Sequence, residues 1–179
     1  MPLIDAVPRA WRIGEYLDCS RADIEWALSV QATESAAGNT KRLGEILLAR
    51  EEITEEDLKQ ALKKQRVDRL RRCSLLEDLS QDDLTSISER IEEVKLPAGE
   101  DLFREDQRGD SMYVVARGHI GIYRQQDGLK PAHIRDVGPG TVLGELGYFT
   151  EGTRSCSATT LDPTVVLKIR YELLSDFII

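Results

Sequence analysis

The placement of glycine divides this 179-residue chain more sharply than any other feature. Ten of the 13 glycines lie between Gly99 and Gly152, and the regions on either side are nearly free of glycine. The same stretch contains short apolar segments that alternate with polar residues, as strands with one buried face do. The middle of the chain is therefore predicted to be a β domain with many turns, and its flanks to be helical.

Several segments between these turns are predicted strands. Ser111–Ala116 is apolar enough for a buried strand, and His119–Arg124 places Ile120 and Ile122 on one face. Asp127-Gly128 has the sequence of a hairpin turn. The other predicted strands are 101–104, 132–137, 141–143 and 164–169. Many short strands at regular spacing favour a jelly roll or a small barrel, so the predicted fold class is α+β with a C-terminal β-roll.

Helices are predicted on both sides of the strands. Ser80 caps a helix expected over 80–92, with Leu84, Ile87 and Ile91 as its inner stripe. A last helix is expected to start at Tyr171. Tyr148 and Phe149, between the strands, are interpreted as core residues.

Composition argues against most kinds of enzyme. The three cysteines form no CxxC pair, and His119 and His133 do not have metal-ligand spacing, so no metal or cofactor is expected. No phosphate-binding P-loop, nucleophile elbow or dinucleotide fingerprint occurs. No segment approaches the roughly 20 apolar residues of a membrane span, and the N-terminus lacks a signal-peptide core. We therefore expect a cytoplasmic binding protein without enzymatic activity.

The net charge of −8 is unevenly distributed. Residues 1–72 carry 13 basic and 13 acidic residues, whereas residues 73–179 carry 11 basic and 19 acidic residues. An acidic surface is poorly suited to neutralising phosphates, so DNA is not an expected partner.

The N-terminal part contains an internal repeat. Arg12–Leu17 (RIGEYL) is similar to Arg42–Leu47 (RLGEIL), and each is followed by a predicted amphipathic helix. The helices are predicted to be capped by Ser20 with Asp23 and by Thr54 with Asp57. Their apolar stripes are Ile24, Ala27, Leu28 and Gln31 in the first copy, and Leu58, Ala61, Leu62 and Gln65 in the second. Ala32–Lys41 is expected to be a loop, and the six cations of Lys63–Arg72 to lie on a helical connector.

Residues 11–66 resemble the N-terminal helical domain of the assembly ATPases of type II secretion and type IV pili. The resemblance implies a small all-α module, and some members of that family bind cyclic di-GMP through two such repeats. Here the first copy is truncated, and Glu51 stands where binding members carry glycine in the turn. A helical docking module is therefore favoured over a cyclic di-GMP site.

The residues from Pro139 to Ala158 suggest a binding site. Gly144 precedes a short predicted helix, whose first backbone N–H groups could hold an anion. Glu145 could accept a bond from a ligand hydroxyl, and Arg154 has the planar, permanently charged group that suits phosphate oxygens. Together these groups describe a clamp for a ribose phosphate.

Residues 74–177 resemble the cyclic nucleotide-binding domain of protein kinase A regulatory subunits, cyclic-nucleotide-gated channels and the bacterial catabolite activator protein. The matching segments are LLEDLSQDDL, LPAGEDLF, GDSMYVV, VGPGTVLGELGYF and TRSCSAT. The resemblance implies a β-roll with a phosphate-binding cassette at Gly144–Cys156. Glu145 would accept the ribose 2′-hydroxyl and Arg154 would pair with the cyclic phosphate. The implied backbone donors are Leu146, Gly147, Ser155 and Cys156.

Three positions depart from that family. Asp106 stands where glycine is common, and Cys156 replaces an alanine and is interpreted as a packing residue. Ser155 stands where cGMP-selective members often carry threonine, which leaves the choice between cAMP and cGMP open. The helix that covers the base in this family is expected to be missing or to lie beyond the chain given.

The predicted organisation is a helical module at 1–66, a basic connector at 67–73 and a cyclic nucleotide-binding domain at 74–179. The predicted function is a regulatory sensor of cAMP or cGMP that transmits ligand occupancy to a protein partner of residues 1–72. A scaffold with an empty β-roll and a dual sensor that also binds cyclic di-GMP are the alternatives. Formation of a homodimer is left open, and no membrane partner is expected.

Overall fold

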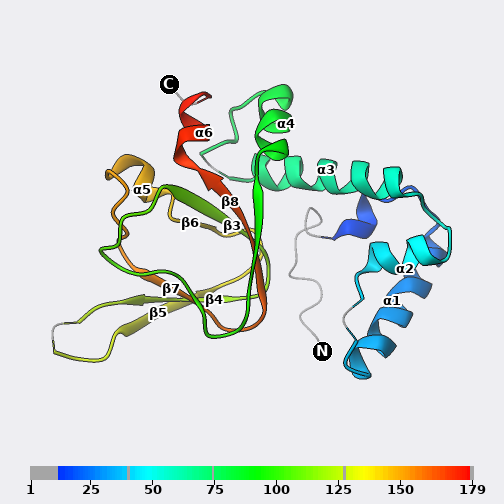
Figure 1. Ribbon diagram of the computed structural model, residues 1–179, viewed down its shortest axis with the longest axis horizontal. Helices are drawn as coiled ribbons and strands as arrows, with labels where there is room; N and C mark the ends of the chain where they lie inside the picture. Colours follow the sequence, from blue (N-terminus) through cyan, green and yellow to red (C-terminus); the bar gives the residue numbers. More distant parts are fainter. Residues whose placement is uncertain (1–11, 40, 74, 127, 178–179) are drawn as a thin grey trace. The chain divides into compact units, whose positions relative to one another are not determined.

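The computed structural model describes residues 12–39, 41–73, 75–126 and 128–177. The chain forms two compact units, Met1–Asp68 and Arg69–Ile179, and each is described by itself (Figure 1). The boundary between the units falls within the long helix α3 (Glu55–Arg71). No helix in the described part of the chain has the length and apolar character needed to span a bilayer.

The described residues of the N-terminal unit form a 3₁₀ turn, two helices and the greater part of α3. The turn is Ile13–Glu15, α1 is Arg21–Ala36 and α2 is Leu43–Ala49, and α3 follows. The two copies of the repeat therefore differ, because the first begins with a three-residue turn where the second has a seven-residue helix. Both copies contribute to one apolar core made of Leu17, Ala27, Leu43, Ile46, Leu47, Ile53 and Ala61.

The predicted caps of the repeat helices are confirmed. The Ser20 hydroxyl accepts from the Asp23 N–H at 3.2 Å, and the Thr54 hydroxyl accepts from the Asp57 N–H at 3.1 Å. Two other expectations are wrong. Helix α1 continues to Ala36, so the loop is shorter than predicted. Leu28 and Leu62 occupy equivalent positions in the two copies and are 48% and 36% exposed. The apolar stripe that faces the core is therefore narrower than predicted, because it does not include these two leucines.

Glu51 follows the C-cap of α2 and forms a left-handed turn with a φ of +61°. The Glu51 N–H donates to the Leu48 carbonyl at 3.0 Å, and the Glu52 N–H donates to the Leu47 carbonyl at 3.1 Å. This pair of bonds is the Schellman motif, in which the left-handed position usually belongs to glycine. Glu51 therefore adopts a left-handed conformation in which glycine is favoured over residues with a Cβ atom.

Replacing Glu51 with glycine should raise the free energy of unfolding of the N-terminal unit by about 0.5–1 kcal/mol. A left-handed residue with a Cβ costs about 1–2 kcal/mol, and part of the gain is offset by the larger backbone entropy of glycine in the unfolded chain. Urea unfolding followed by circular dichroism measures the change. Glu52→Gly, at the next position, should be destabilising, and a loss of stability in Glu51→Gly would contradict the prediction.

The second unit is a roll of two four-stranded antiparallel sheets (Figure 1). One sheet has the order β1-β8-β3-β6 and the other has the order β2-β7-β4-β5. The strands of the first sheet are β1 (Glu92–Leu96), β8 (Thr164–Arg170), β3 (Ser111–Arg117) and β6 (Val142–Leu143). Those of the second sheet are β2 (Asp101–Phe103), β7 (Ser157–Thr160), β4 (Ile120–Arg124) and β5 (Ala132–Val137).

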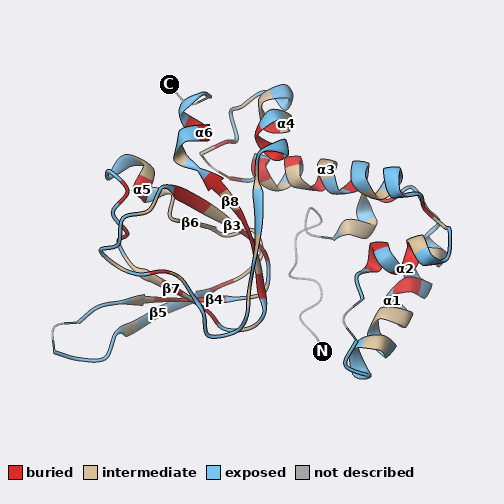
Figure 2. Cartoon of the chain, in the orientation of Figure 1, coloured by how far each residue is buried: buried red, intermediate tan, exposed pale blue. Residues whose placement is uncertain are grey.

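An apolar core fills the roll, and Figure 2 shows buried segments on its central strands. Strand β3 carries Met112, Val114 and Val115, which are fully buried. Ile120 and Ile122 of β4 are both buried, as their shared face predicted. The residues of the core cluster are Phe103, Val115, Ile120, Ile122, Val137, Leu143, Ala158 and Val166. The expected antiparallel β-roll with flanking helices is confirmed.

Two strands were not predicted, and one helix is shorter than expected. Helix α4 (Gln81–Glu89) is capped by Ser80, but it ends before Ile91, and Glu92–Leu96 forms strand β1. Val94 and Leu96 are the apolar residues of this five-residue strand, and both pack against the core. Strand β7 lies in the segment after Arg154. Helix α6 covers Tyr171–Ser175, while Asp127 and residues 178–179 lie outside the described residues.

Candidate functional site

The predicted glycine and short helix are present at the end of β6. Gly144 has a φ of +79°, and helix α5 (Leu146–Phe149) follows directly, with Glu145 as its N-cap. The Gly147 N–H donates to the Gly144 carbonyl at 3.2 Å, and the Tyr148 N–H donates to the Glu145 carbonyl at 3.1 Å. The amide of Gly147 thus already has a backbone acceptor at hydrogen-bond distance, whereas the family resemblance implied that this amide donates to a ligand.

The segment that returns from α5 is fixed by backbone bonds to the loop between β2 and β3. The Gly109 N–H donates to the Gly152 carbonyl at 2.8 Å, and the Arg154 N–H donates to the Gln107 carbonyl at 3.0 Å. In the other direction, the Asp106 N–H donates to the Arg154 carbonyl at 2.9 Å. Asp106 has a φ of +64°, a conformation that suits the glycine common at this position.

Arg154 turns inward from this segment and is only 3% exposed. One terminal nitrogen, Nη1, donates to the Gly144 carbonyl at 3.1 Å and to the Tyr171 hydroxyl at 2.9 Å. The other, Nη2, donates to the Ser111 carbonyl at 2.6 Å. The structure therefore brings Arg154 together with Gly144, the first residue of the predicted clamp.

The surroundings of the Arg154 guanidinium are aromatic. Its central carbon lies 4.6 Å from the ring centre of Phe103, 5.8 Å from that of Tyr113 and 5.9 Å from that of Tyr171. The acceptors of its terminal nitrogens are two carbonyls and a phenol, none of which carries a full negative charge. Its Nε is buried without a hydrogen-bond partner. Arg154 is consequently a buried cation whose charge and Nε donor would both be satisfied by an anion.

Tyr171 is a site residue that the sequence analysis did not identify. It is the first residue of α6, and its N–H donates to the Asp110 carbonyl at 2.7 Å. Its hydroxyl donates to the Gly144 carbonyl in a short bond and accepts from Arg154. Burial raises the pKa of the Tyr171 phenol, so the hydroxyl keeps its proton near neutral pH. The sequence offered one signal for this role, which is an aromatic residue with a hydroxyl group two positions after the last predicted strand.

The remaining predicted site residues differ in exposure. Glu145 is half-buried, Ser155 is exposed, and Leu146 is 53% exposed. Cys156 packs against the core, and burial raises the pKa of its thiol, which agrees with its interpretation as a packing residue. The prediction for Phe149 is wrong, because this side chain is 66% exposed.

The two histidines have carboxylate partners instead of metal-ligand neighbours. His119 Nδ1 lies 2.7 Å from an Asp162 oxygen, and His133 Nε2 lies 2.6 Å from an Asp136 oxygen. Both pairs are exposed. Within the described ranges, no group of three or more histidine, cysteine and acidic residues could hold a metal ion.

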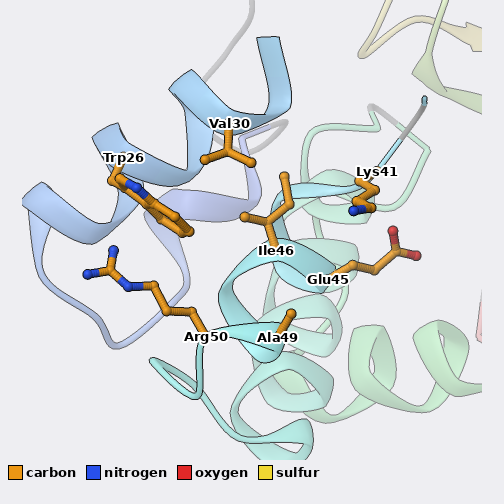
Figure 3. A pocket seen from close by; sticks show the side chains of 7 residues that line it. All are labelled: Trp26, Val30, Lys41, Glu45, Ile46, Ala49 and Arg50. Carbon is orange, nitrogen blue, oxygen red and sulfur yellow. The ribbon is translucent and has the colours of Figure 1, made fainter. Parts of the chain in front are cut away.

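The N-terminal unit has a cavity of its own, about 570 Å³ in volume, between α1 and α2 (Figure 3). Trp26 and Val30 of α1 face Ile46 of α2 and Arg50, the C-cap of α2, across it. The Arg50 guanidinium lies 4.2 Å from the centre of the Trp26 ring, and Trp26 is 39% exposed. Lys41, Glu45 and Ala49 complete the lining. The cavity combines an apolar wall with charged groups, as many binding sites do.

Comparison with known proteins concerns mainly the second unit. The family described as "Cyclic nucleotide-binding domain" matches residues 93–179. The CRP-like cAMP-activated global transcriptional regulator of Mycobacterium tuberculosis is 25% identical over 109 residues, which cover 61% of this chain and 49% of that protein. This chain thus spans about half the length of that relative.

Solved structures give the same result. A cyclic nucleotide-binding-like protein from Brucella abortus is 30% identical with a TM-score of 0.58, over 62% of this chain and 95% of that one. The regulatory domain of Toxoplasma gondii PKA, solved with cAMP, is 25% identical with a TM-score of 0.62, over 65% of this chain and 44% of that one. The resemblance of residues 11–66 to secretion ATPases stays a prediction. Residues 93–179 of this chain form a cyclic nucleotide-binding domain, related to CRP-like regulators and to PKA regulatory subunits.

Proposed function

We propose that this chain is a regulatory sensor that binds cAMP or cGMP at residues 144–156. The observation that carries the proposal is Arg154, a buried cation whose acceptors among the described residues are all neutral, one of them the carbonyl of Gly144 at the start of the predicted clamp. A cyclic phosphate would supply the missing negative charge and an acceptor for Nε. The relatives named for cAMP support the same ligand class.

The neighbouring residues have suitable chemistry for the rest of the ligand. Glu145 is half-buried at the start of α5, so its carboxylate can accept a bond from the ribose 2′-hydroxyl. Leu146 and Ser155 are exposed, and their backbone amides are proposed as further donors to the phosphate. The backbone amide of Cys156 is proposed as a further donor, whereas that of Gly147 could donate to the ligand only in place of its bond to the Gly144 carbonyl.

We also propose that ligand occupancy is transmitted to the N-terminal unit, which binds a protein partner. Helix α3 runs without a break from Glu55 to Arg71 across the boundary between the units and provides a covalent route for such a signal. The cavity beside Trp26 is the observation that favours a binding role for residues 1–72. Transmission requires that the ligand bind two states of the protein with different affinities.

The test of the proposed function is calorimetric titration of the whole chain with cAMP, cGMP and cyclic di-GMP. Binding of a cyclic mononucleotide supports the sensor and identifies the preferred base. Heat from cyclic di-GMP would favour the dual sensor instead. Absence of heat from all three ligands would contradict the sensor and favour a scaffold with an empty roll. The expectation that DNA is not a partner remains a prediction, since the M. tuberculosis relative is a transcriptional regulator.

Replacing Glu145 with glutamine should lower the affinity for cAMP by about three- to tenfold, because a charge-assisted bond to the 2′-hydroxyl is weakened. The matched ligand is 2′-deoxy-cAMP, which lacks that hydroxyl. Its affinity should differ by less than about twofold between the parent and Glu145→Gln. Equal losses for the two ligands would show that Glu145 does not act on the 2′-hydroxyl. Both affinities are measured by calorimetry.

A further inference from the structure

We propose that Tyr171 withholds Arg154 from the ligand, so that the affinity of the site is set partly by a residue of α6. The inference rests on the proposed function, because it names the residue that regulates the same site. Its starting point is the burial of Arg154, which is 3% exposed and has protein acceptors on both terminal nitrogens. A phosphate can bind these nitrogens only after those bonds open.

Tyr171 is the one side chain among the described acceptors of Arg154. The other two acceptors are the backbone carbonyls of Gly144 and Ser111, which are present whatever side chain those positions carry. The Tyr171 hydroxyl bonds Arg154 Nη1 and the Gly144 carbonyl together, and its ring lies beside the guanidinium. Tyr171 therefore supplies the hydrogen bond to inward-facing Arg154 that a side-chain substitution can remove.

Two neighbours allow the phenol to reach this position. The Tyr171 N–H donates to the Asp110 carbonyl at 2.7 Å, which anchors the start of α6 beside β3. A Cβ on Gly147 would collide with the Tyr171 hydroxyl oxygen, so the absence of a side chain at residue 147 leaves room for the phenol. The contact between α5 and Tyr171 therefore depends on the backbone bond of Tyr171 and on the absence of a side chain at Gly147.

The energetic consequence is a lower apparent affinity. If the site binds phosphate only when Arg154 is released, the apparent dissociation constant is the intrinsic one divided by the released fraction. Tyr171→Phe keeps the ring and removes the hydroxyl, so the released fraction rises. The affinity for a cyclic nucleotide should increase by about three- to tenfold, which is the effect of one hydrogen bond. A residue with a purely structural role would give a loss of affinity or no change.

The first measurement requires no ligand. Phenylglyoxal modifies accessible guanidinium groups, and peptide mass spectrometry gives a separate rate for each arginine. In the parent, Arg154 should react at least about tenfold more slowly than Arg124, whose side chain is 69% exposed. In Tyr171→Phe, the rate at Arg154 should rise at least about threefold, and Gly147→Ala should have the same effect by displacing the phenol. Tyr123→Phe, in β4 outside the site, is the matched control and should leave the rate unchanged.

The second measurement is calorimetric titration of the parent, Tyr171→Phe and Tyr123→Phe with cAMP and cGMP, after thermal unfolding has shown that each variant is folded. Tighter binding by Tyr171→Phe alone supports the inference. An unchanged modification rate at Arg154, or unchanged or weaker binding by Tyr171→Phe, would overturn it. If the modification rates change as expected but none of the three proteins binds either nucleotide, the proposed function fails while Tyr171 still controls the exposure of Arg154.

Discussion

Replacing Arg154 with alanine should lower the affinity for the preferred cyclic nucleotide by about ten- to a hundredfold or more. The charge-assisted bonds between a guanidinium and a phosphate contribute about 1.5–3 kcal/mol, and alanine can form none of them. The same change removes a side chain that is 3% exposed and leaves the carbonyls of Ser111 and Gly144 without this donor. A loss of about 1–3 kcal/mol in the free energy of unfolding should accompany the loss of binding.

Two further variants separate these effects. Arg154→Lys keeps the positive charge without the planar fork, so its affinity should fall between those of the parent and Arg154→Ala. Arg117→Ala removes an exposed arginine at the end of β3 and should leave nucleotide affinity unchanged. Calorimetry gives the affinities and urea unfolding gives the stabilities. Nucleotide affinity that is unchanged in Arg154→Ala would reject the assignment of Arg154 to the phosphate.

For Arg154, the position in the chain could be predicted from the sequence, but the direction of the side chain could not. The order of Gly144, Glu145 and Arg154 is local, and it was sufficient to predict the turn and the short helix that follow β6. The inward direction of the Arg154 side chain depends on Ser111 and Tyr171, which lie 43 and 17 positions away along the chain. A long side chain can point in many directions from one backbone position, so its contacts are set by tertiary structure that no local pattern encodes.

The same distinction applies to the fold. The apolar run of β3 and the alternation of β4 predicted these strands, because both features are typical of strands that contribute to a core. Strand β1 was not predicted because Val94 and Leu96 are the only apolar residues among its five, and its strand conformation comes from pairing with β8. Asp106 and Glu51 were identified as departures from glycine, and both adopt a positive φ. The resemblance to known families thus located these two left-handed turns. Residue preferences alone would not have done so, because such turns favour glycine or asparagine over glutamate.

Replacing Gly152 with alanine should lower the free energy of unfolding of the second unit by about 2–4 kcal/mol. Gly152 has a φ of +84°, and a Cβ built on it would lie 2.6 Å from the carbonyl oxygen of Gly109. The left-handed conformation costs about 1–2 kcal/mol for a residue with a Cβ, and overpacking against a backbone atom adds about 1–3 kcal/mol. No side-chain rotation relieves the collision, because the atom that the Cβ meets belongs to the backbone. The bond from the Gly109 N–H to the Gly152 carbonyl, at 2.8 Å, opposes a separation of the two segments.

Gly99→Ala is the control that separates the two contributions. Gly99 has a φ of +81°, but a Cβ built on it meets nothing within 4 Å, so its replacement should cost about 1–2 kcal/mol from backbone strain alone. Urea unfolding should therefore rank Gly152→Ala as the more damaging change, and equal losses would mean that the loop moves freely away from Gly109. The segment with Gly152 and Arg154 is bonded to the segment with Gln107 and Gly109, and the Arg154 N–H donates to the Gln107 carbonyl. A displacement of Gly152 should therefore also displace Arg154, so Gly152→Ala should weaken nucleotide binding, whereas Gly99→Ala should not. The close approach of Gly109 and Gly152 would then be part of the binding site as well as of the fold.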